Sequence, residues 1–424
     1  MSKYSRRRLL ASAAAIGLSN LLHPQFCLAD VDEFCDDIQP PDRLPRTFSL
    51  PLPLFSAGSV WREQVKTVPL KANHDQIVEA TYNMLTAEKQ NFCYINFDDW
   101  TIPIFEADPG QPSQRMFVNG YGGDMWPSST MKSVQEHHRW IVEGVPAPRG
   151  LIRPAGPQCL TSDGSMVLYD VANQRSYDFW QATTCREYWG PTKGGGLWGE
   201  TVLEAGDIEC FDVTGIGAQK VLDGKPRTSA RATGVPLLAG LLIPEDLSQG
   251  ENSKVNHPLV FSLPGFRVGV PGVPDFAYPA SKTENSNPLQ NPHALGAGER
   301  IRLRKNNLID TEGQPVNESG LSPITQVVLK TLRTYGAYLV DGGKAFTFYA
   351  EDIHTAPYAA SAPVVNRLAG RDESALIGAN ESRWEIVMQT LVDEIRKIPF
   401  AIKINGSLHA NFEMIANAAP PAGF

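Results

Sequence analysis

Residues 166–180 read MVLYDVANQRSYDFW, and they contain the clearest structural signal in the chain. Two runs of strand-forming residues, Met166–Asp170 and Tyr177–Gln181, flank a short connection over residues 171–176. Strand-forming runs separated by such a connection predict a β-hairpin.

The second strand of this hairpin has two different faces. Because successive side chains of a strand point to opposite sides, Tyr177 and Phe179 share one face while Asp178 and Trp180 share the other. The aromatic pair is typical of core packing. A carboxylate beside an indole ring suits a sugar, which offers C–H faces for stacking and hydroxyls for hydrogen bonds.

Many other short runs predict strands, whereas only three segments predict helices. Asn73 can cap a helix that runs to about Gln90, Ser322-Pro323 starts a second helix that ends at Gly336, and Asn380 opens a third. The other strand candidates are Phe92–Phe97, Ile102–Glu106, Val235–Ile243, Leu259–Leu263, Ile301–Arg304, Ala337–Val340, Ala345–Tyr349 and Phe400–Ile404.

Strands that outnumber helices and do not alternate with them favour a mostly β chain. We expect a large β-sandwich or jelly-roll-like domain with a few covering helices. The expected layout is an export signal at residues 1–29, an N-terminal extension at 30–58, a single large β-rich catalytic or glycan-binding domain at 59–410 and a tail at 411–424.

The N-terminus predicts export. Residues 1–29 carry four basic residues, no acidic residue and a short apolar run over Leu9–Leu22. The stretch Ser5–Leu10 resembles the twin-arginine signature, which implies bacterial export in the folded state by the twin-arginine machinery. We expect cleavage ahead of Asp30, a periplasmic or secreted product, and no stable membrane span after processing.

Composition excludes one class of partner. The chain has 38 Lys and Arg against 46 Asp and Glu, a net charge of −8, which falls to −12 when the four cations of the signal are removed. Nucleic-acid binding needs clustered cations, so we expect none. Five cysteines remain after processing, and an oxidising compartment favours disulfide bridging among Cys159, Cys185 and Cys210.

Familiar catalytic motifs are absent from the sequence. It contains no nucleophile elbow, P-loop, HExxH motif or dinucleotide fingerprint. We expect no cofactor and no metal.

A first function hypothesis is glycosidic hydrolysis, which needs two carboxyl groups, one as the acid and one as the base or nucleophile. Asp178 and Asp341 are the candidate pair. The candidate substrate-binding aromatic residues are Trp180, Trp189, Trp198 and Tyr338. The alternative is that these aromatic residues build the core and that the carboxylates face solvent.

A second hypothesis is β-elimination on a uronic-acid polymer. Arg231 would neutralise the substrate carboxylate, and His257 or Tyr335 would move the proton. The alternative is a structural arginine and a buried histidine with satisfied hydrogen bonds.

Several segments resemble a family of exported bacterial proteins, largely of unassigned function and sometimes fused to carbohydrate-binding modules. These segments are Ser59–Trp61, Trp100–Phe105, Met166–Trp180, Arg231–Glu245, Asn256–Leu259, Gly296–Leu303 and Thr334–Asp341. The resemblance implies work on glycans outside the cytoplasm. Relatives in that family carry a Gly-His pair where this chain has Gly164-Ser165, so a histidine role at that position would be lost.

The sequence thus favours an exported polysaccharide-degrading enzyme, with a glycoside hydrolase as the first hypothesis and a polysaccharide lyase as the second. A non-catalytic glycan-binding or surface-assembly protein is the alternative from another class. A polysaccharide or oligosaccharide is the expected partner in all three cases.

Overall fold

The computed structural model describes residues 45–421 except residues 99, 119–131, 137–138, 150–163, 187–200, 220–229, 249–251, 285–286, 358–361 and 373–382. All described residues belong to one compact unit, Pro40–Phe424. The expected export signal, Trp189, Trp198 and Cys159 lie outside the described residues. Within the described part, no helix is long and apolar enough to cross a membrane.

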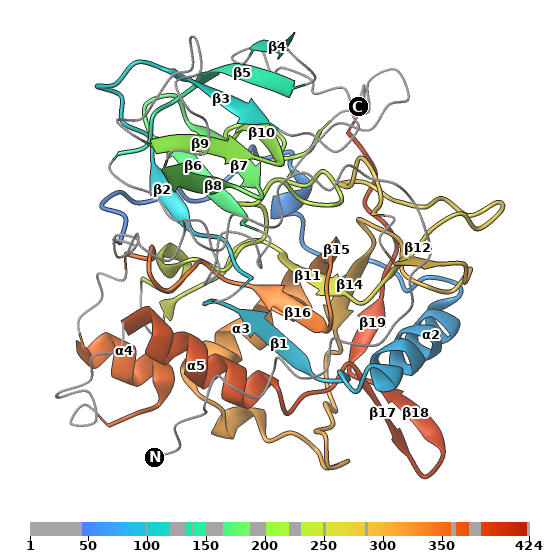
Figure 1. The fold of residues 1–424 in the computed structure, drawn as a ribbon. Coiled ribbons are helices and arrows are strands. Elements are labelled where there is room, and N and C mark those ends of the chain that lie inside the picture. Colours follow the sequence, from blue (N-terminus) through green and yellow to red (C-terminus); the bar gives the residue numbers. More distant parts are fainter. Residues whose placement is uncertain are drawn as a thin grey trace. The chain divides into compact units, whose positions relative to one another are not determined.

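The largest sheet has six strands in the order β1-β16-β11-β15-β14-β19 (Figure 1). It is mixed, because β1 runs parallel to β16 and β11 parallel to β15, whereas the remaining neighbours are antiparallel. The strands are β1 (Cys93–Asn96), β11 (Leu259–Leu263), β14 (Arg300–Leu303), β15 (Ala337–Gly342), β16 (Phe346–Tyr349) and β19 (Phe412–Met414). All but β19 lie where the sequence predicts strands.

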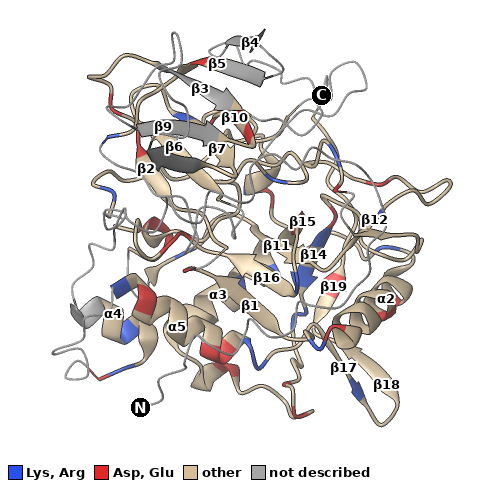
Figure 2. Cartoon of the chain, in the orientation of Figure 1, with Lys and Arg blue, Asp and Glu red and all other residues tan. Residues whose placement is uncertain are grey.

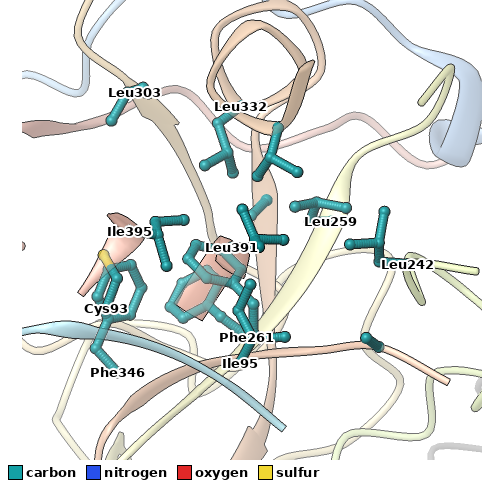
Figure 3. Packing of buried hydrophobic residues seen from close by; sticks show 14 of the residues in the cluster. Cys93, Ile95, Leu242, Leu259, Phe261, Leu303, Leu332, Phe346, Leu391 and Ile395 are labelled. Atoms are coloured by element: carbon teal, nitrogen blue, oxygen red, sulfur yellow. The ribbon is translucent and has the colours of Figure 1, made fainter. Parts of the chain in front are cut away.

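Four described helices pack on one face of this sheet. They are α2 (His74–Ala87), α3 (Pro323–Thr334), α4 (Ala362–Ala369) and α5 (Arg383–Ile395). Leu332 of α3 and Leu391 of α5 join Phe261 and Phe346 of the sheet in one hydrophobic cluster (Figure 3). Removal of this apolar surface from water holds the helices on the sheet. The sequence predicts α2, α3 and α5, and α4 is an additional helix of only eight residues.

A four-stranded sheet contains the predicted hairpin. Its order is β10-β7-β6-β2. The strands are β2 (Ile104–Glu106), β6 (Met166–Asp170), β7 (Arg175–Trp180) and β10 (Asp207–Asp212). β6 and β7 pair antiparallel, with Met166 opposite Phe179, which confirms the hairpin.

A five-stranded sheet shares a core with the four-stranded one. Its order is β4-β5-β3-β9-β8, and its strands are β3 (Gln114–Val118), β4 (Lys132–Glu136), β5 (Arg139–Val145), β8 (Thr183–Arg186) and β9 (Thr201–Ala205). Val118 and Val142 of this sheet join Tyr177 and Phe179 of β7 in one hydrophobic cluster. Two small ribbons complete the described strands, β12 (Phe266–Arg267) with β13 (Pro288–Leu289) and β17 (Ala401–Ile404) with β18 (Ser407–Ala410).

The described chain is mostly sheet with few helices, as the sequence predicts. The finer expectation of a β-sandwich or jelly roll stays a prediction.

The segment over residues 230–243 corrects one prediction. The sequence predicts a strand at Val235–Ile243, but the structure has consecutive turns there. Gly234 and Gly240 have φ values of 78° and 69°, and a Cβ on Gly240 would lie 2.5 Å from Val260 Cγ1. Apart from Arg231 and Thr233 the segment is apolar, and it lies in a hydrophobic cluster between the six-stranded and four-stranded sheets. We call residues 230–243 the buried turn segment.

Arg46 ties the start of the described chain to this core. Its guanidinium donates to both carboxylate oxygens of Glu351, at 2.8 and 2.9 Å, and to both of Glu245, at 2.6 and 2.7 Å. Burial alone lowers the pKa of Arg46, but the charges and hydrogen bonds of the two glutamates more than reverse this and raise it. The pairing keeps Arg46 charged inside the protein.

Removal of this arginine should be costly. Arg46→Ala leaves Glu351 buried without its cation, so we expect a loss of about 3–5 kcal/mol in the free energy of unfolding. Arg149→Ala is the matched control, because its ion pair with Glu106 is half-exposed and should contribute about 1 kcal/mol or less. Urea denaturation of both variants measures the difference, and equal losses would contradict the assignment.

Candidate functional site: a charge cluster between two sheets

Asp178 occupies the face of β7 that turns away from the Tyr177 and Phe179 core. Trp180 shares this face and packs against the cluster around the buried turn segment, which confirms the predicted alternation. Glu209 of β10 lies directly opposite Asp178 in the strand register. Directly opposite side chains have Cβ atoms about 4.5–5.5 Å apart. Two carboxylates, 0% and 1% exposed, therefore share one buried surface.

Asp178 and Arg231 hold the same residue of the buried turn segment. The backbone N–H of Leu237 donates to Asp178 Oδ2 at 2.6 Å, and an Arg231 terminal N–H donates to the Leu237 carbonyl at 3.1 Å. The Arg231 guanidinium is fully buried and lies 5.3 Å from the ring centre of Tyr349. These contacts join β7 to the turns that separate the two sheets.

The surroundings of Asp178 favour its protonated form. Burial raises the pKa of this carboxyl from 3.8 to about 7, although the Leu237 N–H and the charge of Arg231 act in the opposite direction. Burial also lowers the pKa of Arg231, against the charges of Asp341 and Asp178. A substantial share of the molecules therefore carries a proton on Asp178 at neutral pH.

Asp341 brings a third carboxylate to this place from the six-stranded sheet. It lies on β15 beside Ser262, is half-buried, and acts electrostatically on both Arg231 and Lys282. Burial lowers the pKa of the half-buried Lys282, while Asp207, Glu209 and Asp341 act to raise it. We call Asp178, Glu209, Arg231, Lys282 and Asp341 the junction cluster.

The structure places His257 and Tyr335 elsewhere, in a pocket of about 450 Å³ that neither Arg231 nor Asp178 lines. His257 Nε2 lies 3.0 Å from Asp246 Oδ2, and Nδ1 lies 2.9 Å from the Pro258 carbonyl. We call this cavity the His257 pocket.

Both ring nitrogens of His257 thus face acceptors, which favours the doubly protonated imidazolium. Burial lowers the pKa of His257, but Asp246 outweighs this effect and the pKa is raised above 6.5. A cation with both N–H groups engaged has no lone pair for proton abstraction. The structure therefore separates Arg231 from His257 and Tyr335 and gives His257 no position as a base.

Tyr338 does not have the surface that its expected role requires. It is 1% exposed, its hydroxyl accepts from Arg300 at 3.1 Å, and its ring packs edge-on against Trp61 with centroids 5.3 Å apart. Its face of β15 points into the core, so the structure offers no exposed surface of Tyr338 for the expected substrate contact. Trp180 is half-buried and packs against the cluster around the buried turn segment.

Sequence reasoning missed Glu209, Lys282 and Asp246. Glu209 had a usable signal, since polar residues alternate with apolar ones through residues 207–210, as they do in β7. Lys282 comes from a long polar loop, and no periodicity indicates its position. The expected cysteine bridge stays a prediction, since Cys159 and the Cys185 side chain lie outside the description and Cys210 is buried on β10.

The described residues contain no group of three or more His, Cys, Asp or Glu side chains that could hold a metal ion. Comparison with protein-family models, with characterised proteins and with solved structures finds no match for this chain. The chemistry of the junction cluster and of the His257 pocket therefore has to be inferred from their own geometry.

The raised pKa of Asp178 has a consequence for stability. Because its folded pKa of about 7 exceeds 3.8, the folded chain binds more protons than the unfolded chain between these values, and the contribution of Asp178 to the free energy of unfolding falls as pH rises through this range. Asp178→Asn removes this contribution.

Urea denaturation of both proteins between about pH 4 and 8.5 tests this linkage. We expect the difference in unfolding free energy, wild type minus variant, to decrease up to about pH 7 and then to level off. A difference that does not change with pH would contradict the raised pKa.

Proposed function

We propose that this protein is an exported polysaccharide-degrading enzyme that hydrolyses glycosidic bonds at the junction cluster. The observation that carries the proposal is a pair of carboxyl groups in unlike surroundings. Asp178 is fully buried with a pKa of about 7, whereas Asp341 is half-buried beside two cations. A buried acid with a raised pKa near a second, more exposed carboxyl is an arrangement that acid–base chemistry on a sugar uses.

In the proposed reaction, protonated Asp178 donates its proton to the glycosidic oxygen as the bond from the anomeric carbon to that oxygen breaks. Asp341 acts as the base that takes a proton from the attacking water, whose hydroxyl ends on the anomeric carbon, and return of that proton to Asp178 through solvent restores the starting state. Trp180, on the same strand face as Asp178, supplies a surface for a sugar ring. Because Asp178 is 0% exposed, the reaction requires that a sugar unit reach it past the half-buried Trp180 and Asp341.

The same burial favours a second candidate function, glycan binding without cleavage. Asp178 and Arg231 then act only to hold the buried turn segment, through the Leu237 contacts. β-Elimination has less support, since His257 and Tyr335 line a different pocket from Arg231 and both nitrogens of His257 are engaged.

The proposal also includes a β-sandwich scaffold and export out of the cytoplasm. The hydrophobic cluster shared by the four-stranded and five-stranded sheets supports a β-sandwich in this half of the chain. The basic, apolar N-terminus supports twin-arginine export to the periplasm or beyond, and the net charge of −8 supports a partner other than nucleic acid.

Carboxylate variants test the hydrolase proposal. On a panel of neutral and acidic glycans, wild type should release reducing ends, and Asp178→Asn and Asp341→Asn should each lose about 10²-fold or more in kcat/KM, as expected when an acid–base group is removed. Asp75→Asn, a fully exposed carboxylate on α2, is the control and should keep full activity. Thermal unfolding of each variant checks that loss of activity is not loss of the fold.

The pH profile gives an independent reading of the same proposal. Since the acid must be protonated, kcat/KM should fall as pH rises above about 7, where Asp178 ionises. Release of reducing ends by both variants at wild-type rates would contradict the proposal. Glycan binding with no release by wild type would favour the non-catalytic candidate, and ultraviolet absorbance of an unsaturated uronate would indicate a lyase.

A further inference from the structure

The His257 pocket carries positive charge that no described residue neutralises. Arg62, at the end of the short 3₁₀ turn η1 (Val60–Arg62), and Lys254 both line it and are exposed. Neither forms an ion pair with a side chain in the described part of the chain. Asp246 is 1% exposed at its side chain and is already bonded to His257, so it does not offset them. The lining therefore has a surplus of two positive charges.

Figure 2 shows how other cations of the chain are placed. Basic residues colour β14, and acidic colour appears on the neighbouring β19. There Arg302 donates to Glu413 at 2.7 Å, and Arg300 pairs with Glu63 at 2.9 Å. Arg300 and Arg302 are thus matched by carboxylates close by, whereas no described side chain forms an ion pair with Arg62 or Lys254.

Part of the pocket lining is apolar and includes a strained residue. Leu52, Leu54, Phe55 and Trp61 form it. Phe55 has a φ of 68°, a left-handed conformation that is unfavourable for a bulky residue, and its N–H is fixed by the Val213 carbonyl at 2.7 Å. Backbone strain of this kind clusters at ligand sites, where the surrounding structure maintains it.

The lining also supplies neutral hydrogen-bonding groups. Gln64, Asn256 and Tyr335 lie on it beside the two cations. These side chains can bond to hydroxyl groups, whereas the apolar wall can cover the flat face of a small ring. The cavity of about 450 Å³ lies within the range of pockets that hold small molecules.

We propose that the His257 pocket binds a small sugar acid, with the ligand carboxylate between Arg62 and Lys254 and the sugar ring against the Phe55 wall. Charge decides the ligand class, since a carboxylate neutralises cations that otherwise lack a partner, and charge-assisted hydrogen bonds are the strong ones. The hydrogen-bonded His257–Asp246 pair forms part of the pocket lining and does not bind the ligand carboxylate in this proposal. This site lies apart from the junction cluster and does not depend on whether that cluster hydrolyses glycans.

Calorimetric titration of the full chain with glucuronate tests the proposal, and glucose, a neutral sugar of nearly the same shape, is the matched ligand control. We expect saturable binding of glucuronate and binding of glucose at least about tenfold weaker, the effect of roughly one charge-assisted contact. Arg62→Gln and Lys254→Gln should each weaken glucuronate binding about five- to tenfold and leave glucose unaffected. Lys330→Gln, on an exposed position of α3, should change nothing.

Two results would overturn the proposal. One is equal affinity for glucuronate and glucose, or no saturable binding of glucuronate. The other is glucuronate binding that neither Arg62→Gln nor Lys254→Gln weakens. Both substituted side chains are exposed, so a change in affinity is not a sign of unfolding, and thermal unfolding of the variants confirms this.

Discussion

The hydrogen bond from the Leu237 amide to the buried Asp178 carboxylate is the contact on which the described architecture depends. It joins a strand of one sheet to turns that lie against the other sheet. Those turns contain Gly234 and Gly240 at positive φ and have no ladder of strand hydrogen bonds to fix them. The Asp178 and Arg231 contacts to Leu237 therefore help to position the buried turn segment, together with the hydrogen bond from the Thr233 hydroxyl to the Val340 carbonyl and the isolated bridge between Leu242 and Ala350.

This constraint has an energetic cost that shapes the chemistry. A carboxylate at 0% exposure loses its hydration, and the Leu237 amide and Arg231 compensate only in part, which is why its pKa rises to about 7. Arg46 shows the contrasting solution, in which four hydrogen bonds to two glutamates keep a buried cation charged. A partly compensated acid is suited to proton transfer, whereas the Arg46 arrangement is suited to holding a chain in place.

Local sequence patterns predicted the features that depend only on residues close together in the chain, such as strand alternation and helix starts. The period of two in β7 placed Asp178 and Trp180 on one face, and Ser322-Pro323 marked the start of α3. The prediction of secondary structure failed for a segment that is covered by a sheet on each of its two sides. The apolar run at 235–243 resembles a strand because two sheets cover it, although only Leu242 pairs, in an isolated bridge with Ala350. Tyr338 likewise resembled a ligand contact but lies beneath Trp61.

The sequence could not predict which side chains that are far apart in the chain lie close together in the folded protein. Asp178, Arg231 and Asp341 were each candidates, but only the packing of two sheets brings them together, and it does so with Glu209 and Lys282. His257 was a candidate base because of its residue type, and the sequence could not show which side chains contact its ring. The short 3₁₀ helix η2 (Pro244–Leu247) supplies Asp246, which turns the imidazole into one half of an ion pair.

The most direct test of this account is the titration of the Asp178 carboxyl itself. Carbon-13 NMR of the full chain, labelled at aspartate carboxyl carbons and assigned by the signal lost in Asp178→Asn, follows that one group against pH. We expect a midpoint near pH 7, because burial between the two sheets raises the pKa of this carboxyl to about that value. A midpoint below about pH 5, close to an ordinary aspartate, would show that the carboxyl is well solvated or fully paired and would contradict the account.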